Sequence, residues 1–337
     1  MPNIREVAKA SGYSVATISR VINHPNSVSP DTREKVFKIM RDMEYTPNTH
    51  ARGLALDKSN SIALILPDVL DMSYIKIARG IEEIAHQKGY FVFLCNSENN
   101  HERELENLDM LVKGRRVDGI ILVNSLLSDD ELYSLQKEKV PIVLAGRKRQ
   151  IENTNAVYID YARGSYNAAK HFISLGYRSL GFISNKSTAF EDEEKFSGFV
   201  QAINEHSISI NENFIIEDEK SIRGGTRAAK KLLMGKSLPE ALLVSCDPAA
   251  LAVLKCLNEN EIKVPEQIAI IGFDNVDISE LVSPRLTTIA FPAHKLGLLS
   301  ARLLFDDIDN RGYESQEIFL QTALNIRESC GHGRTKY

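Results

Sequence analysis

The sequence has few cysteines and no long apolar run. No run reaches the roughly 18 apolar residues that a membrane helix needs, and the first 30 residues lack a signal-peptide pattern. The cysteines form neither a CxxC pair nor a Cys/His cluster, so we expect reduced structural thiols and no bound metal. They are Cys95, Cys246, Cys256 and Cys330. These absences predict a cytoplasmic protein with no membrane partner.

The sequence also lacks the motifs of common α/β enzymes. It contains no GxGxxG, GxxxxGKS/T or GxSxG segment, and its eight histidines are dispersed. No Ser/His/Asp set can be discerned. We therefore expect no catalytic residue and no cofactor.

The charge is distributed unevenly along the chain. Residues 1–58 hold nine Lys/Arg and six Asp/Glu, or +3, whereas the whole chain has a net charge of −4. A small basic module joined to a larger acidic one is typical of a nucleic-acid contact at the N-terminus. An imbalance of this size can also arise by chance, so the charge alone does not decide the function.

The first 46 residues predict three short helices. In VAKASGYSVATISRVIN, residues 7–23, apolar residues recur at helical spacing on both sides of Gly12. Asn3 with Glu6 is a capping pair for the first helix, and Ser14 can cap the second. Ser29 before Pro30 marks the start of a third helix. Three helices this close together predict a minimal bundle.

The second of these helices carries a polar face. Ile18 and Val21 point to one side, and the residues of the other side are Ala16, Ser19, Arg20 and Asn23. Two helices joined by a Gly-containing turn are typical of a helix-turn-helix, whose second helix enters the DNA major groove. Arg20 can donate two hydrogen bonds to guanine, and Ser14, Thr17 and Ser19 suit phosphates or base edges. A surface face of a helical hairpin is the alternative that this pattern leaves open.

A linker follows at residues 46–61, TPNTHARGLALDKSNS. Residues 49–56 can form a helix, but Gly53 weakens it by about 1 kcal/mol relative to Ala. A helix this short is not stable alone in water, so we expect it to be frayed until another surface holds it.

From residue 61 apolar runs such as SIALIL, GIILV and IAIIGF alternate with helical stretches of 12 to 20 residues. Continuous apolar strands separated by helices predict parallel sheets covered on both faces. The alternation restarts after VYID, residues 157–160, so we expect two doubly wound subdomains. Such folds bind ligands at the carboxyl ends of their strands.

Many segments in order resemble the lactose/galactose repressor (LacI/GalR) family. They include the helix-turn-helix segment, VSPDTREKV, YTPNTHARGL, SIALILPD, PIVLAGR, VPEQIAIIGFDN and SPRLTTI. The resemblance implies a helix-turn-helix headpiece, a hinge helix and a core like periplasmic sugar-binding proteins. It places the headpiece at 1–46, the hinge and linker at 47–60, one core subdomain at 61–160 and 291–317, and the other at 161–290 and 318–330.

The resemblance also assigns DNA contacts. Val15 and Ala16 fall where the family varies its base-reading residues, and Arg20 falls on its base-contacting arginine. Small apolar side chains at 15 and 16 would read thymine methyl groups or DNA shape. Leu54 matches the hinge leucine that wedges into the minor groove, with ordinary packing as the alternative. His50 and Ala51 are placed beside it in the DNA-binding hinge.

A small-molecule effector is implied in the core, between the subdomains. The residues at effector-lining positions are Ser73, Tyr74, Arg147, Lys195, Lys220, Asp247 and Asp274. Asp247 before Pro248 is equally suited to a helix N-cap, and stabilisation of a turn is the alternative role of Asp274. Gly146 replaces an aspartate that often precedes the arginine, and lysines stand at 195 and 220. This suggests an anionic carbohydrate, although the four acids at 191–194 argue against one.

The resemblance implies a homodimer on double-stranded DNA with a palindromic operator. No leucine heptad follows IRES near the C-terminus, so we expect a dimer and not a tetramer. The sequence leaves two alternatives open. The core could bind a protein corepressor, such as a phosphocarrier protein, in place of a small molecule, and the protein could be an activator in place of a repressor.

Overall fold

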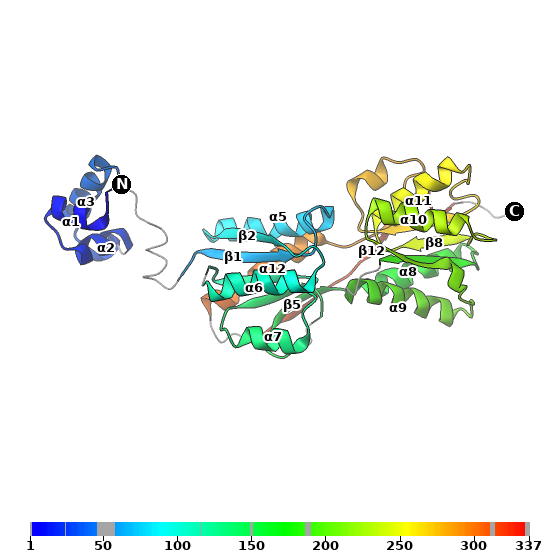
Figure 1. Ribbon diagram of the computed structural model, residues 1–337, viewed down its shortest axis with the longest axis horizontal. Helices are drawn as coiled ribbons and strands as arrows, with labels where there is room; N and C mark the ends of the chain where they lie inside the picture. The colour runs from blue at the N-terminus through cyan, green and yellow to red at the C-terminus, as the bar shows by residue number, and fades with distance from the viewer. Residues whose placement is uncertain are drawn as a thin grey trace. The chain divides into compact units, whose positions relative to one another are not determined.

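The computed structural model describes residues 2–23, 25–45, 58–114, 116–148, 151–185, 190–310 and 314–333. The chain divides into two units, residues 1–60 and residues 61–337. Figure 1 labels their helices and some of their strands. No helix in the described ranges has both the length and the apolar character that crossing a bilayer requires.

The first unit is a bundle of three helices, which we call the headpiece: α1 (Ile4–Ser11), α2 (Val15–Asn23) and α3 (Pro30–Asp42), with a 3-10 turn η1 (Pro25–Ser27). The predicted capping box of Asn3 and Glu6 is confirmed at α1, and Ser29 caps α3. Gly12 has φ +76° in the turn between α1 and α2, a conformation that glycine adopts without steric cost. The small core consists of Val7, Ala8, Ile18, Val21, Val36 and Met40.

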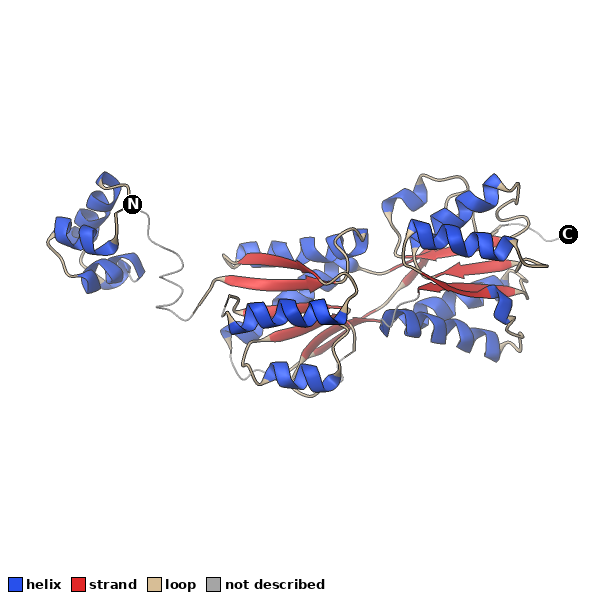
Figure 2. Ribbon diagram, viewed as in Figure 1, coloured by secondary structure: helices blue, strands red, loops and turns tan. Residues whose placement is uncertain are grey.

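The second unit, which we call the core, contains two six-stranded sheets with helices on both sides of each (Figure 2). The first sheet has the strands β1 (Ser61–Leu66), β2 (Phe91–Asn96), β3 (Gly119–Val123), β4 (Ile142–Gly146), β5 (Asn155–Ile159) and β11 (Glu317–Leu320). Its helices are α5 (Met72–Gln87), α6 (His101–Lys113), α7 (Asp129–Gln136) and α12 (Ala293–Asp309). We call this half the first subdomain.

The second subdomain repeats the plan. Its strands are β6 (Leu180–Asn185), β7 (Ile215–Asp218), β8 (Ala241–Val244), β9 (Ala269–Phe273), β10 (Thr287–Ala290) and β12 (Ala323–Asn325). Its helices are α8 (Tyr161–Ser174), α9 (Phe190–Glu205), α10 (Ile222–Leu233) and α11 (Asp247–Glu259), with 3-10 turns η2 (Glu212–Phe214) and η3 (Asp277–Glu280).

The strand orders are β11-β5-β4-β3-β1-β2 and β12-β10-β9-β8-β6-β7. Neighbouring strands pair in parallel except β10 with β12. This confirms the expected fold class of two doubly wound parallel-sheet subdomains. The chain passes between the subdomains three times, and the last passage follows β11, which ends at Leu320. The boundary expected between residues 317 and 318 was therefore wrong by three residues, because a short strand of the first sheet occupies that position.

Most of the expected strands are buried, but β2 is not. It is the edge strand of the first sheet, and Phe91 and Phe93 on it are 77% and 48% exposed. An apolar run that looked like an interior strand therefore presents its side chains at the surface.

Candidate functional site

The polar face of α2 is exposed in the headpiece. Ile18 and Val21 are fully buried against the other helices, whereas Val15, Ala16 and Arg20 are exposed. Ser19 and Thr17 are half-buried at the margin of this face. One helix thus holds the fold with one side and presents small apolar groups and a guanidinium with the other, which is the arrangement that groove reading requires.

Ser14 has a structural task in this helix. Its Oγ accepts a hydrogen bond from the backbone N–H of Thr17 at 3.1 Å and lies 2.9 Å from the Thr17 hydroxyl oxygen. The hydroxyl caps the first turn of α2 while remaining exposed. Ser14 and Thr17 therefore orient the start of the helix that carries Val15 and Ala16.

Several predicted DNA contacts lie outside the described residues. They are the side chain of Asn23, and His50, Ala51 and Leu54 with the hinge helix around them.

In the core, side chains from the carboxyl ends of strands in both subdomains lie together. Asp71 and Tyr74 follow β1, and Asn124 follows β3. Glu191 and Lys220 follow β6 and β7 of the other sheet. The Asn124 amide Nδ2 donates to Glu191 Oε2 at 2.9 Å, so the two subdomains are in direct contact here. We use the name cleft for the junction between the two subdomains, which these side chains and their neighbours fill.

The two predicted lysines of the cleft have acidic partners. Lys220 Nζ lies 3.0 Å from Glu191 Oε1 and 3.1 Å from Asp71 Oδ2. Lys195, fully buried, donates to the Ser245 carbonyl at 3.1 Å and lies 3.9 Å from Glu191 Oε2. The cleft therefore offers no surplus of positive charge. This weakens the suggestion of an anionic effector, because an anion would have to displace carboxylates that already neutralise both lysines.

Electrostatic interactions keep Glu191 and Lys220, at the centre of the cleft, ionised. Burial alone would raise the pKa of Glu191, but Lys195, Lys220 and the Asn124 amide lower it to about 2. Burial alone would lower the pKa of Lys220, but Glu191, Tyr74 and Asp71 raise it well above its ordinary value.

Asp274 has a carboxylate that the described part of the protein leaves incompletely satisfied. It follows β9 with φ +111°, and its backbone N–H donates to the Ile289 carbonyl at 2.8 Å. Its Oδ2 is buried and has no hydrogen-bond partner among the described residues, as is true of the Ser245 hydroxyl. Burial raises the pKa of Asp274. A strained backbone and an unpaired buried acceptor together make Asp274 a candidate for contact with a ligand donor.

Asp247, a predicted effector residue, has a partner for each of its carboxylate oxygens in the second subdomain. Its Oδ1 accepts from the Thr288 hydroxyl at 2.6 Å, and its Oδ2 accepts from the Val276 N–H at 3.0 Å. The side chain is fully buried, and burial raises its pKa to about 7. It is also not the N-cap of α11, because that helix begins at Asp247 and Cys246 is its cap residue. Asp247 thus fixes the loop after β9 that carries Asp274.

Arg147 and Ser73 also contribute to structure. Arg147 donates to the carbonyls of Ser125 and Leu127 at 3.0 and 2.7 Å, within its own subdomain. Ser73 is buried in the first turn of α5, where its backbone N–H donates to Asp71 Oδ1 at 2.8 Å. Tyr74, in contrast, faces the cleft: Lys220 Nζ lies 5.1 Å from its ring centroid, and its hydroxyl accepts from Asn124.

The break in the family pattern at Gly146 has a steric reason. Gly146 has φ +86°, and a Cβ at this position would lie 2.1 Å from Asn124 Oδ1. An aspartate here would therefore exclude the Asn124 side chain from the place from which it reaches Glu191.

Sequence reasoning missed Asp71 and Asn124 as cleft residues and treated Glu191 only as a repelling charge. The sequence did contain a signal for Asp71 and Asn124, because both are polar residues that follow shortly after apolar strand-like runs.

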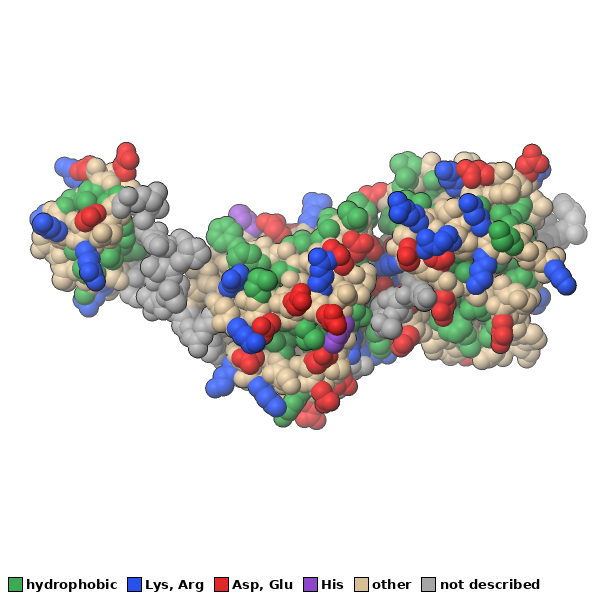
Figure 3. Space-filling view, in the orientation of Figure 1, with side chains coloured by type: hydrophobic (Ala, Val, Ile, Leu, Met, Phe, Trp, Pro, Cys, Tyr) green, Lys and Arg blue, Asp and Glu red, His purple; other side chains and the backbone are tan. Residues whose placement is uncertain are grey.

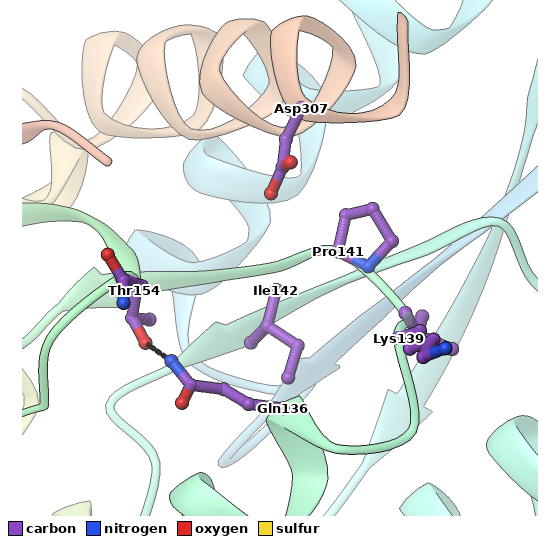
Figure 4. A pocket seen from close by; sticks show the side chains of 8 residues that line it. Gln136, Lys139, Pro141, Ile142, Thr154 and Asp307 are labelled. Carbon is purple, nitrogen blue, oxygen red and sulfur yellow. Dashed lines mark hydrogen bonds between the residues drawn. The ribbon is translucent and has the colours of Figure 1, made fainter. Parts of the chain in front are cut away.

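Two pockets of the core lie away from the cleft. One, of about 400 Å³, is lined by Gln136, Ile142, Thr154 and Asp307 near the amino ends of β4 and β5 (Figure 4). The other, of about 590 Å³, lies between α6 and α7. Neither contains a predicted effector residue.

Comparisons with known proteins agree with this arrangement. Residues 3–48 match the family model "Bacterial regulatory proteins, lacI family", and residues 169–330 match "Periplasmic binding protein-like domain". The chain is 35% identical over 329 residues to the HTH-type transcriptional regulator DegA of Bacillus subtilis (strain 168), covering 97% of both chains. It is similar to the structure of a CelR–cellobiose complex, with a TM-score of 0.73, 27% identity and coverage of 98% of this chain and 100% of that one. A lac repressor dimer bound to operator has the same fold, with a TM-score of 0.85, 23% identity and coverage of 98% and 99%.

Proposed function

The chain belongs to the LacI family of bacterial regulatory proteins, and from this premise we propose that it represses transcription as a homodimer on a palindromic operator, under the control of a small-molecule effector. It is a DNA-binding transcriptional regulator and not an enzyme. We infer that it acts in the cytoplasm, where its operator would lie.

The exposed face of α2 is the observation that carries this proposal. Arg20 projects from a helix whose other side is locked in the headpiece core by Ile18 and Val21. Its guanidinium can make a bidentate contact with guanine, while Val15 and Ala16 suit thymine methyl groups. A single small headpiece buries too little DNA for high affinity, so two headpieces in one dimer account for specific binding.

Exposed apolar side chains of the core support the homodimer. They lie near the start of α5, on the edge strand β2, and on α10 and η3, and Figure 3 shows hydrophobic side chains at the surface over α5 and β2. The residues are Leu70, Met72, Ile75, Phe91, Phe93, Ile222, Ile278 and Leu281. An exposed apolar edge strand invites pairing with another chain, and a second copy that covers these side chains would remove that risk.

The effector we propose is a carbohydrate in the cleft. Its hydroxyl groups would donate to Asp274 Oδ2 and exchange hydrogen bonds with the Ser245 hydroxyl, which satisfies two buried groups at once. The similar CelR structure holds cellobiose, a neutral sugar. An anionic carbohydrate is the second candidate, since Lys195 and Lys220 would partner it if Asp71 or Glu191 moved away.

The experiment that tests operator binding is selection of DNA from a random pool by the purified full chain at about 0.15 M salt, where phosphate attraction alone gives weak binding. We expect enrichment of a palindrome, and with Arg20→Ala a weaker enrichment whose base preference is relaxed at one position of each half-site. Enrichment of a single asymmetric half-site would contradict the dimer. If the folded protein enriches no DNA sequence, with or without sugars, the proposal as stated is overturned. The alternative that DNA binding needs a protein corepressor would then remain. Fusion of the selected site to a reporter gene then separates repressor from activator.

Calorimetric titration of the full chain tests the effector. Neutral sugars, sugar acids and hexose phosphates are compared at equal ionic strength, and Asp274→Asn serves as the test variant that removes the proposed acceptor. We expect the wild type to bind neutral sugars and Asp274→Asn to bind them more weakly. Binding of the phosphates alone would favour the anionic candidate.

A further inference from the structure

Lys220 joins the two subdomains through buried charges. It follows β7 of the second subdomain, and its Nζ lies 3.0 Å from Glu191 Oε1 of the same subdomain. On its other side Nζ lies 3.1 Å from Asp71 Oδ2 and 5.1 Å from the Tyr74 ring centroid, both of the first subdomain. The ammonium is thus held between two carboxylates and above an aromatic face.

The carboxylates around Lys220 are themselves fixed. Asp71 caps α5 through its Oδ1, which leaves Oδ2 for the lysine. Glu191 is 5% exposed, and its Oε2 accepts from Asn124 across the cleft. These groups are preorganised acceptors for one cation, and the side chain of Lys220 supplies it.

We propose that Lys220 is an internal ligand of the core: its ammonium occupies part of the cleft and holds the two subdomains together before any small molecule binds. Only a cation can replace it between Asp71 and Glu191 above Tyr74, because two carboxylates and an aromatic ring all favour positive charge there. An effector that works by changing subdomain closure must therefore overcome this contact. That last step rests on the proposed function, whereas the contact itself does not.

Burial distinguishes this contact from the ion pair of Lys76 and Asp277, which also joins the subdomains. The side chains of Lys220 and Asp71 are 18% and 12% exposed, whereas those of Lys76 and Asp277 are 39% and 83% exposed at 2.9 Å. Exposed pairs contribute little, but removing one partner of a buried pair leaves the other charge uncompensated. Lys76 is therefore a matched control: a lysine that also bridges the subdomains but in solvent.

The test is hydrogen–deuterium exchange of the full chain without DNA or sugar, comparing the wild type with Lys220→Ala and Lys76→Ala. We expect the segments around residues 71–77, 124–128 and 190–195 to exchange at least about tenfold faster in Lys220→Ala, and to be unchanged in Lys76→Ala. Adding about 50 mM propylammonium should restore protection in Lys220→Ala, whereas 1-propanol, which has a similar size and no charge, should not.

Equal exchange in the wild type and Lys220→Ala would overturn the proposal. Restoration by propanol as good as by propylammonium would also overturn it, since it would mean that Lys220 only fills space. If Lys220→Ala does not fold, Lys220→Arg and Lys220→Gln decide: the arginine should keep the protection and the glutamine should lose it, and equal behaviour would contradict the internal ligand. The assay contains neither operator nor effector, so failure of the proposed function does not affect its result.

Discussion

The headpiece and the cleft hold their functional side chains in opposite ways. On α2, Ile18 and Val21 stabilise the fold, while Val15, Ala16 and Arg20 are exposed and free to contact DNA. In the cleft, Glu191, Lys195 and Asp247 are buried and bonded to neighbouring groups, so each takes part in the fold as well as in the site that we propose. Substitutions should therefore separate stability from binding in the headpiece but couple them in the cleft.

Removal of Glu191 should have the largest effect. In Glu191→Ala the buried Lys195 loses its carboxylate neighbour, and Lys220 keeps Asp71 as its ion-pair partner among the described residues. We expect the free energy of unfolding of the core to fall by about 3–5 kcal/mol, as for other broken buried ion pairs. Urea unfolding of the full chain measures it. Glu193→Ala is the control, because Glu193 is exposed on the same helix and should change stability by less than about 0.5 kcal/mol. Equal losses would mean that burial of the charge does not matter here.

The pH dependence should show that Asp247 costs stability when it ionises. Burial raises its pKa from 3.8 to about 7, so between these values the native state binds a proton that the unfolded chain has released. The free energy of unfolding should therefore fall as pH rises from about 4 to about 7, by up to about 1.4 kcal/mol per pH unit. Asp247→Asn should flatten this slope in urea titrations at pH 5, 6 and 7. An unchanged slope would assign the pH dependence to other groups.

Two glycines allow a direct comparison of the regions. Gly12 of the headpiece and Gly146 of the cleft both have positive φ, +76° and +86°. Alanine in such a conformation costs about 1–2 kcal/mol. A Cβ on Gly12 meets nothing within 4 Å, but one on Gly146 meets Asn124 Oδ1 at 2.1 Å. Gly146→Ala should therefore destabilise its unit by about 2–3 kcal/mol and Gly12→Ala by less.

The double variant Gly146→Ala with Asn124→Ala identifies the cause of that difference. It should lose less stability than the sum of the single variants, because removal of the amide makes room for the Cβ. Additive losses in thermal unfolding would show that the backbone conformation alone accounts for the cost at Gly146.

The same contrast explains how far sequence could predict this protein. The headpiece followed from local spacing, because the Asn3–Glu6 cap and the buried side of α2 depend on residues three or four positions apart. The alternation of apolar runs and helices likewise predicted the two doubly wound sheets. Sequence did not indicate the short strands β7, β10, β11 and β12, nor the exposure of β2, because these depend on which strands become neighbours.

The sequence could predict the location of the cleft but not the interactions among its side chains. The groups of the cleft come from loops after β1, β3, β6, β7 and β9, and they meet because of the strand order within each sheet and the contact between the two subdomains. Lys195 and Lys220 suggested an anion site when considered singly. Their carboxylate partners include Asp71, 149 positions before Lys220 in sequence, so no local pattern could show that the charges are balanced.

Arg20→Ala should separate binding from stability in the headpiece. Loss of a bidentate guanine contact should weaken specific operator binding by about 1–3 kcal/mol and relax the base preference at that position. Since Arg20 is exposed, the thermal unfolding of the headpiece should change by less than about 0.5 kcal/mol. Fluorescence anisotropy with a selected operator, at a fixed salt concentration, gives the first quantity. A loss of stability as large as the loss of binding would remove the contrast between the two regions.

Ser14→Ala should have the smallest effect. It tests whether stability and DNA binding are separate at every position of the headpiece. Ser14 lies beside the exposed face, yet its Oγ accepts the Thr17 N–H that opens α2. Loss of this cap should cost about 1 kcal/mol of headpiece stability, and Ser14→Asn, which can still accept that bond, should cost little. Operator binding then discriminates between the two roles of the hydroxyl. If Ser14→Asn binds like the wild type, Ser14 acts by orienting α2. If it is stable but binds weakly, the hydroxyl contacts DNA itself, and the headpiece would then contain a residue that couples fold and function as the buried groups of the cleft do.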